Sequence, residues 1–258
     1  MTQSAPARLK EAIENQELAL HYQPIVDLRT RKAVTAEALL RWKNPAEHEG
    51  KAHELSGESE KSQTMFQLGD WTMRTACEDA VRWQRIHPGV KVNLNLSARE
   101  FQREDLIDRL ARVFGDTGIE PHRVNLEITE SASISDPEHA AKILWELKER
   151  GLELWLDDFG TGHSSLQWLK TFPIDGLKIP DAFVCDISTD PKCHVIVGAI
   201  MTMAHALDLA VVAEGVETEK QLQTLVEHGC DLIQGYYFFK PMPAEEMIEV
   251  LGSRQQAT

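Results

Sequence analysis

The sequence predicts an α/β protein whose strands close into a modified TIM (β/α)8 barrel. Segments with the short apolar pattern of strands alternate with segments of helical periodicity, an order typical of a parallel sheet. About eight such units follow one another, which is the number that closes a barrel. The length of 258 residues suits one large barrel or two ordinary domains, and no interdomain linker divides the chain. We therefore expect a single domain over residues 1–258, with a core from about 9 to 251.

The first part of the chain departs from this repeat. The expected elements are a short helix near 8–15, a strand over 18–28, a strand over 33–42 and a polar surface loop over 43–63. Only the polar turn 29–32 separates the two strands, as in a β-hairpin. Alternation along the second strand puts Glu37, Leu39 and Arg41 on one face, where the charges need partners.

Regular strand–helix units follow the loop. After a helix over 64–86, the expected strand and helix pairs are 90–97 with 102–114, 124–130 with 137–150, 152–156 with a short helix from 164, 176–179 with 191–206, 209–214 with 217–228, and 231–239 with 244–251. The short connections between these segments favour parallel strands with helices as crossovers.

Composition excludes several classes of partner. The formal net charge of −14 argues against non-specific binding to nucleic acid or to an anionic membrane surface. The four cysteines show no CxxC spacing, which predicts reduced thiols in a cytosolic protein. The first residues lack an apolar signal region, and no apolar run has the length of a bilayer span. We therefore expect a cytoplasmic location with no nucleic-acid or membrane partner.

A polar residue lies at the end of nearly every expected strand. These residues are Asn95, Glu127, Asp157 with Asp158, Lys178, Glu214 and Gln234. The carboxyl ends of barrel strands meet on one face, and that face carries the active site in such barrels. We expect these side chains to converge there, and Glu37 from the early hairpin can join them.

The paired carboxylates of Asp157 and Asp158 point to bound cations. Like charges at the end of a buried strand repel each other and lose hydration, so a positive group should lie beside them. An oxygen-rich set without histidine or cysteine suits Mg²⁺ or Mn²⁺ better than zinc. With Glu214, the two aspartates could hold a second ion, and two ions about 4 Å apart are a common device for phosphoryl hydrolysis.

Each of these residues also has an ordinary explanation when it is taken alone. An aspartate can cap a helix beside a solvent-facing neighbour, Lys178 can extend its ammonium to the surface, and Asn95 can serve a turn. Their recurrence at successive strand ends favours one common site.

The chain resembles a known family at a series of short motifs. In order, these are Tyr22-Gln-Pro-Ile25, Glu37-Ala-Leu39, Leu40-Arg-Trp42, Asn95-Leu-Ser97, Glu127-Ile-Thr-Glu130, Asp157-Asp-Phe-Gly160, Leu177-Lys-Ile179, Ala213-Glu-Gly-Val-Glu217 and Gln234-Gly235. They resemble the motifs of EAL-domain cyclic di-GMP phosphodiesterases, from about residue 9 to residue 251.

The resemblance implies a TIM-like barrel with one early antiparallel strand and hydrolysis of cyclic di-GMP to linear pGpG with two Mg²⁺ or Mn²⁺ ions. It also implies residue roles. One ion would be held by Glu37, Asn95, Glu127 and Asp157, and the second by Asp157, Asp158 and Glu214. Lys178 would polarise the attacking water, and Glu130 would brace the loop after Asp158. The substrate would be bound by Gln23, Glu37, Leu39, Arg41, Asn95 and Gln234. A homodimer through that loop and the following helix is a further implication.

The chain departs from the family pattern at three places. Residues 52–63 are shorter and more polar than the usual segment, where Glu60 alone keeps its place. Pro180 replaces the aspartate that commonly follows Lys178-Ile179, and His163 stands where an aromatic residue is common. An alternative function is therefore a catalytically impaired EAL protein that binds cyclic di-GMP or a protein partner. An unrelated barrel phosphohydrolase is disfavoured by the order of the motifs.

Overall fold

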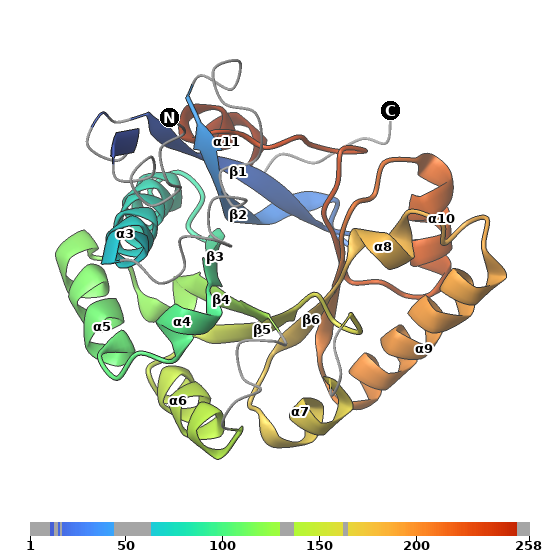
Figure 1. Cartoon of the computed structure of the whole chain (residues 1–258). Coiled ribbons are helices and arrows are strands. Elements are labelled where there is room, and N and C mark those ends of the chain that lie inside the picture. Colours follow the sequence, from blue (N-terminus) through green and yellow to red (C-terminus); the bar gives the residue numbers. More distant parts are fainter. Residues whose placement is uncertain are drawn as a thin grey trace, which may run out of the picture.

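A closed ring of strands forms the centre of the computed structural model, which describes residues 11–12, 15, 17–43, 63–129, 137–161 and 165–251 (Figure 1). Neighbouring strands follow the order β2-β3-β4-β5-β6-β7-β8-β1-β9, and a β1–β2 pairing closes the ring. The strands are β1 (Leu18–Asp27), β2 (Lys32–Trp42), β3 (Lys91–Leu96), β4 (Val124–Thr129), β5 (Glu153–Asp157), β6 (Gly176–Ile179), β7 (Ala210–Ala213), β8 (Leu232–Ile233) and β9 (Met242–Pro243). The predicted barrel is confirmed.

One strand runs against the others. β1 is antiparallel to β2, β8 and β9, whereas β2 through β8 pair in parallel. The turn between β1 and β2 is stabilised by Asp27, which accepts hydrogen bonds from the backbone N–H and the hydroxyl of Thr30. Arg31 completes it with a φ of 58°. The hairpin register places Gln23 opposite Glu37, which brings two predicted site residues together.

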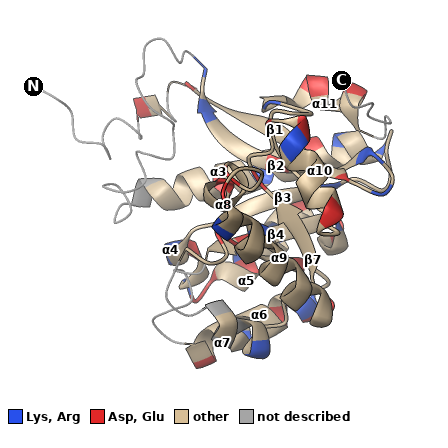
Figure 2. Ribbon diagram, turned by 90° about the vertical axis from the view of Figure 1, so that its right-hand side faces the viewer, with Lys and Arg blue, Asp and Glu red and all other residues tan. Residues whose placement is uncertain are grey.

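Helices cover the outside of the ring (Figure 1). They are α3 (Gln63–Gln84), α4 (Ala98–Phe101), α5 (Leu106–Thr117), α6 (Pro137–Glu149), α7 (Ser165–Thr171), α8 (Asp181–Val184), α9 (Pro191–Ala206), α10 (Glu219–Glu227) and α11 (Ala244–Val250), with a 3-10 turn at Pro121–Arg123. In the side view, charged residues of both signs lie along these helices (Figure 2). Among the described helices, none combines the length and apolar character that crossing a membrane requires.

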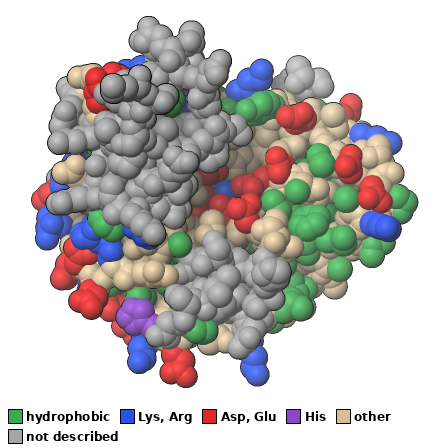
Figure 3. Space-filling view, in the orientation of Figure 1, with side chains coloured by type: hydrophobic (Ala, Val, Ile, Leu, Met, Phe, Trp, Pro, Cys, Tyr) green, Lys and Arg blue, Asp and Glu red, His purple; other side chains and the backbone are tan. Residues whose placement is uncertain are grey.

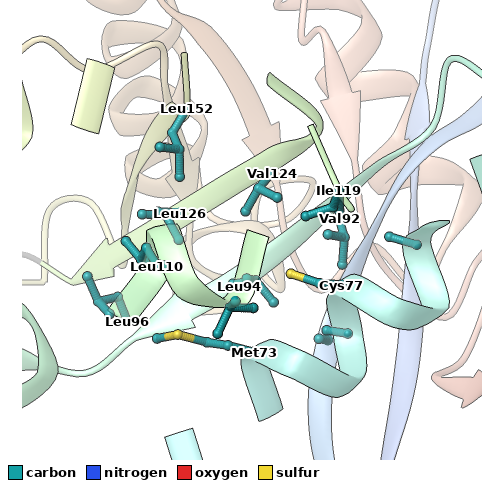
Figure 4. Close-up of a cluster of buried hydrophobic side chains, with 14 of the residues drawn as sticks. Met73, Cys77, Val92, Leu94, Leu96, Leu110, Ile119, Val124, Leu126 and Leu152 are labelled. Carbon is teal, nitrogen blue, oxygen red and sulfur yellow. The ribbon is translucent and has the colours of Figure 1, made fainter. Parts of the chain in front are cut away.

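The main apolar core lies between the strands and the helices, outside the ring. Met73 and Cys77 of α3 pack there with Val92 and Leu94 of β3 (Figure 4). Leu126 of β4 belongs to the same cluster. These strand residues alternate with polar ones that face inward, as the period of two requires.

The interior of the ring has an apolar part and a polar part. Ile25 of β1, Trp155 of β5 and Val212 of β7 come from strands that are not neighbours, so their contact crosses the barrel. On the other side, Thr35 of β2 and Asn93 of β3 are buried and hydrogen-bonded to each other. A filled barrel interior of this kind supports the residues above it at the carboxyl ends.

Two predicted elements were wrong in extent. The strand expected over 231–239 ends at Ile233, because residues 234–239 turn, with Phe238 and Phe239 donating backbone hydrogen bonds to Gly235. The helix expected over 102–114 begins at Leu106, because Ser97 caps the separate helix α4. The short β9 and α8 were not predicted. Most of the loop expected over 43–63 and of the helix expected near 8–15 lies outside the described residues.

Candidate active site

Lys178 lies at the centre of the acidic face that the sequence predicts. Its side chain is 1% exposed, and β6 holds it between β5 and β7. Its Nζ atom lies 3.2 Å from Glu37, 2.9 Å from Glu127, 3.5 Å from Asp157 and 2.6 Å from Glu214. Burial alone would lower the pKa of Lys178, but the surrounding carboxylates raise it well above its usual value. The lysine is therefore a fixed ammonium.

Glu37 collects three donors. Asn95 donates to its Oε1 at 2.7 Å, and Gln234 and Lys178 donate to its Oε2 at 2.7 Å and 3.2 Å. Burial would raise the pKa of Glu37, but Lys178 and the amide donors together hold it below the usual value. Gln234 also donates to Gln23, which in turn donates to the carbonyl oxygen of Phe239 at 3.1 Å.

Asp157, Asp158 and Glu214 form a cluster of oxygen ligands. Each offers a carboxylate oxygen, and these oxygens lie within 4.8 Å of one another. Asp158 has a φ of 55°, an uncommon conformation for a residue with a side chain, and such strain is concentrated at functional sites. The backbone N–H of Phe159 donates to the carbonyl oxygen of Lys178, so the turn after β5 is tied to β6.

The cluster carries an excess of negative charge. Four carboxylates (Glu37, Glu127, Asp157 and Glu214) contact the Lys178 ammonium, and Asp158 lies beside two of them, which leaves a formal charge of −4. Burial raises the pKa of Glu214 to about 7, and burial together with Asp157 raises the pKa of Asp158. The space-filling view shows acidic side chains around a hollow at the centre of this face, with a basic side chain among them (Figure 3).

A cavity of about 280 Å³ lies beside the carboxylates. Glu214 and Gln234 line it, together with Asp181, Glu217 and Tyr236, which sequence reasoning did not select. Asp181 directly follows Pro180, and Tyr236 directly follows Gly235. A Cβ atom at Gly235 would lie 2.1 Å from the carbonyl oxygen of Val216, so only glycine lets the two loops at this wall meet.

The other residues that the sequence predicts for the site either make no hydrogen bond or ion pair with the carboxylate cluster or lie outside the described residues. Leu39 and Arg41 are half-buried on β2, and the guanidinium of Arg41 donates to the carbonyl oxygen of Leu40 at 2.8 Å. Neither makes a hydrogen bond or ion pair with the carboxylate cluster among the described residues. Glu130, Glu60 and His163 lie outside the described residues. Pro180 is the N-cap residue of α8, where its missing N–H is tolerated, and Lys178 keeps its four carboxylate partners.

Sequence reasoning also missed two buried amides below the site. Asn93 donates to Oε1 of Glu127 at 2.5 Å, and Asn125 donates to Oδ1 of Asn93 at 2.8 Å. A signal was present, since Asn93 is two residues before Asn95 and Asn125 two before Glu127, which puts each pair on the same face of its strand.

Comparison with known proteins places these observations in a family. Residues 7–241 match the model of the EAL domain. The signaling protein YkoW of Bacillus subtilis (strain 168) is 42% identical over 238 residues, which are 92% of this chain and 30% of that protein. The cyclic di-GMP phosphodiesterase NbdA of Pseudomonas aeruginosa is 37% identical over 244 residues, 94% of this chain and 31% of that protein. The chain thus spans less than a third of the length of these two relatives.

A solved structure supports the same assignment. The PaMucR phosphodiesterase in complex with c-di-GMP matches with a TM-score of 0.89 and 35% sequence identity, over 95% of this chain and 100% of that chain.

Proposed function

Because this chain belongs to the EAL domain family, we propose that it is a divalent-metal-dependent phosphodiesterase that hydrolyses cyclic di-GMP to linear pGpG and so lowers this second messenger in bacterial signalling. The observation that carries the proposal is the acidic cluster of the site, in which four carboxylates contact Lys178 and Asp158 lies beside Asp157 and Glu214.

The donor set fits divalent cations. All five charged ligands are carboxylates, which hard cations such as Mg²⁺ and Mn²⁺ prefer, and two divalent ions would balance the formal charge of −4. We assign Glu37, Asn95, Glu127 and Asp157 to one ion, and Asp157, Asp158 and Glu214 to the other. When bound, such ions polarise the phosphoryl oxygens and lower the pKa of a water molecule.

The residues of the chain would orient the reactants. Water adds its oxygen to one phosphorus atom, the bond from that phosphorus to the 3′ oxygen breaks, and the 3′ oxygen takes up a proton. In this scheme Lys178 orients and polarises the attacking water. Gln23 and Gln234 bind the ligand at the wall of the cavity, and Arg41 turns from the Leu40 carbonyl to a phosphate, for which a guanidinium is well suited.

The proposal extends to the setting of the enzyme. We assign one EAL domain to residues 1–258, a cytoplasmic location in keeping with four free cysteines, and a homodimer formed through the segment after Asp158, braced by Glu130. Light scattering tests the assembly: a monomer at concentrations that give full activity would contradict the dimer.

The test of the function is a product assay. Purified protein is incubated with cyclic di-GMP and Mn²⁺ or Mg²⁺, and the nucleotides are resolved by chromatography. We expect pGpG from the wild type, none after chelation of the metal, and a loss of at least about 100-fold in Glu37→Gln, in which an amide meets three donors. Glu246→Gln, an exposed change on α11, is the matched control and should keep full activity.

The same assay separates the alternatives. Binding of cyclic di-GMP by calorimetry without pGpG would contradict the enzyme and indicate a receptor. Neither binding nor product would leave a protein-interaction module that keeps only the fold.

A further inference from the structure

A line of hydrogen bonds continues from the site into the middle of the barrel. Lys178 donates to Oε2 of Glu127 at 2.9 Å, and Asn93 donates to Oε1 of the same carboxylate at 2.5 Å. The Oδ1 atom of Asn93 accepts from the hydroxyl of Thr35 at 2.8 Å and from the amide of Asn125 at 2.8 Å. These residues come from β2, β3, β4 and β6, so the line ties four strands together.

The contacts of Asn93 fix which way its amide faces. Its oxygen is occupied by two donors, so its NH₂ group must point at Glu127. A flipped amide would put its oxygen against the Glu127 carboxylate, which accepts and does not donate, and its NH₂ against the amide of Asn125. Both oxygens of Glu127 therefore accept hydrogen bonds, one from each side, and neither Lys178 nor this amide can act as an acceptor in return.

Burying three polar side chains in the barrel interior is energetically unfavourable, which indicates that they have a role at the site. Thr35, Asn93 and Asn125 are 5%, 1% and 2% exposed, and burying polar side chains is unfavourable unless they are hydrogen-bonded. Packing does not demand them, since Ile25, Trp155 and Val212 fill the other part of the same interior. The polar residues lie on the side where Glu127 needs support.

We propose that Asn93 is a positioning residue: locked by Thr35 and Asn125, it holds the Glu127 carboxylate in the one orientation that serves both the lysine and a bound cation. The inference rests on the proposed function for the role of that cation. Without the amide, one oxygen of Glu127 loses its donor and the carboxylate can rotate, so Lys178 and the cation lose a fixed ligand.

The experiment measures Mn²⁺ binding by calorimetry without nucleotide, and kcat and KM with cyclic di-GMP. Asn93→Leu is nearly isosteric and removes the donor; we expect Mn²⁺ affinity and kcat to fall about 10- to 100-fold with little change in KM. Thr35→Val removes one lock and should show a smaller loss in the same direction. Tyr22→Phe is the control, because it removes a buried hydrogen bond, to Asp79, on the outer side of the ring.

A double-variant cycle identifies the route of the effect. If Asn93 acts through Glu127, adding Asn93→Leu to Glu127→Gln should change Mn²⁺ affinity by less than about twofold. Folded Asn93→Leu with wild-type Mn²⁺ affinity and kcat would overturn the inference. If Asn93→Leu does not fold, an unchanged Thr35→Val would overturn it as well.

The two proposals fail in different ways. Mn²⁺ binding by the wild type without any pGpG would refute the phosphodiesterase, while the variant affinities still decide the role of Asn93. Normal hydrolysis by Asn93→Leu would refute the positioning role alone. No Mn²⁺ binding by the wild type would refute both.

Discussion

Among the described residues, Lys178 is the single cation that pairs with the carboxylates of the site. Its removal should therefore lower the free energy of unfolding. In Lys178→Met, Glu37 and Glu127 stay buried without their ammonium. Breaking a buried ion pair on one side typically costs about 3–5 kcal/mol, so we expect a loss of that order in the free energy of unfolding at pH 7.5. Urea denaturation measures it.

The pH dependence of that loss is part of the prediction. Lowering the pH protonates the unpaired carboxylates, so the difference between Lys178→Met and the wild type should shrink at pH 5. Arg150→Met is the control: it breaks an exposed ion pair with Glu146 and should change stability by less than about 1 kcal/mol. Equal losses in the two variants would contradict the central role of Lys178.

The sequence alone identifies the candidate residues of the site but not the hydrogen bonds between them. Strand ends reveal Glu127, Asp157, Asp158 and Glu214 as candidates, because the geometry of a barrel brings strand ends together, and alternation along the early hairpin adds Glu37. What could not be predicted is which side chain bonds to which. That depends on the register between strands, which sets Asn93 beside Asn125 and Asn95 beside Glu127. Alternation alone does not give the register.

At the scale of elements, His194 of α9 contacts His228, the C-cap residue of α10. The rings of His194 and His228 lie with centroids 4.4 Å apart. Burial, and then His194, lower the pKa of His228, while Glu227 acts in the opposite direction. In the unfolded chain His228 titrates at its usual value, so the unfolded state binds more protons in the interval between the two values. The contribution of His228 to the free energy of unfolding is therefore full above its usual pKa, and it is lost as the pH falls through its lowered pKa in the folded protein.

NMR titration of the His228 ring protons tests this contact. We expect a midpoint below the usual 6.5, and an upward move in His194→Ala, which removes a neighbouring positive charge at low pH. A midpoint at or above 6.5 in the wild type would contradict the prediction.

The close approach of two loops at the cavity wall makes a second prediction for elements. A Cβ atom at Gly235 would lie 2.1 Å and 2.3 Å from the carbonyl oxygen and the nitrogen of Val216, and backbone atoms cannot move aside cheaply. Gly235→Ala should therefore reduce the free energy of unfolding by more than about 2 kcal/mol. Gly89→Ala has open space around it and should stay within about 0.5 kcal/mol. Similar melting temperatures of the two variants would refute this account.

The same glycine explains why one strand was predicted too long. The apolar run 231–239 has the composition of a strand, but the chain turns at Gly235 because that residue packs against another loop. The contact between Gly235 and the loop at Val216 therefore determines where the strand ends. The two-residue β9 was missed for a related reason, since it exists only by pairing with β1. The long helices, whose periodicity is local, were placed within a few residues.

At the scale of the whole molecule, burial divides the cysteines into two classes. Cys77 and Cys230 are buried, and burial raises the pKa of each thiol to about 12, whereas Cys185 is exposed and Cys193 partly so. We expect a disulfide reagent such as Ellman's reagent at pH 8 to modify two thiols rapidly in the native protein and four in denaturant. Rapid modification of a third native thiol would contradict the burial of Cys77 in α3 or of Cys230 in the connection between α10 and β8.

Closure of the barrel by β1 has a consequence for the time course of folding. β1 needs β8 beside it, with Val26 paired to Ile233, so the ring joins segments about two hundred residues apart. Contacts between such distant segments are slow to form because the entropy of closing the loop is lost before they stabilise the chain. During synthesis, β1 and β2 can form their hairpin early, yet that hairpin must keep a free edge until β8 has left the ribosome. The first strand of the barrel is therefore among the last to acquire all its neighbours.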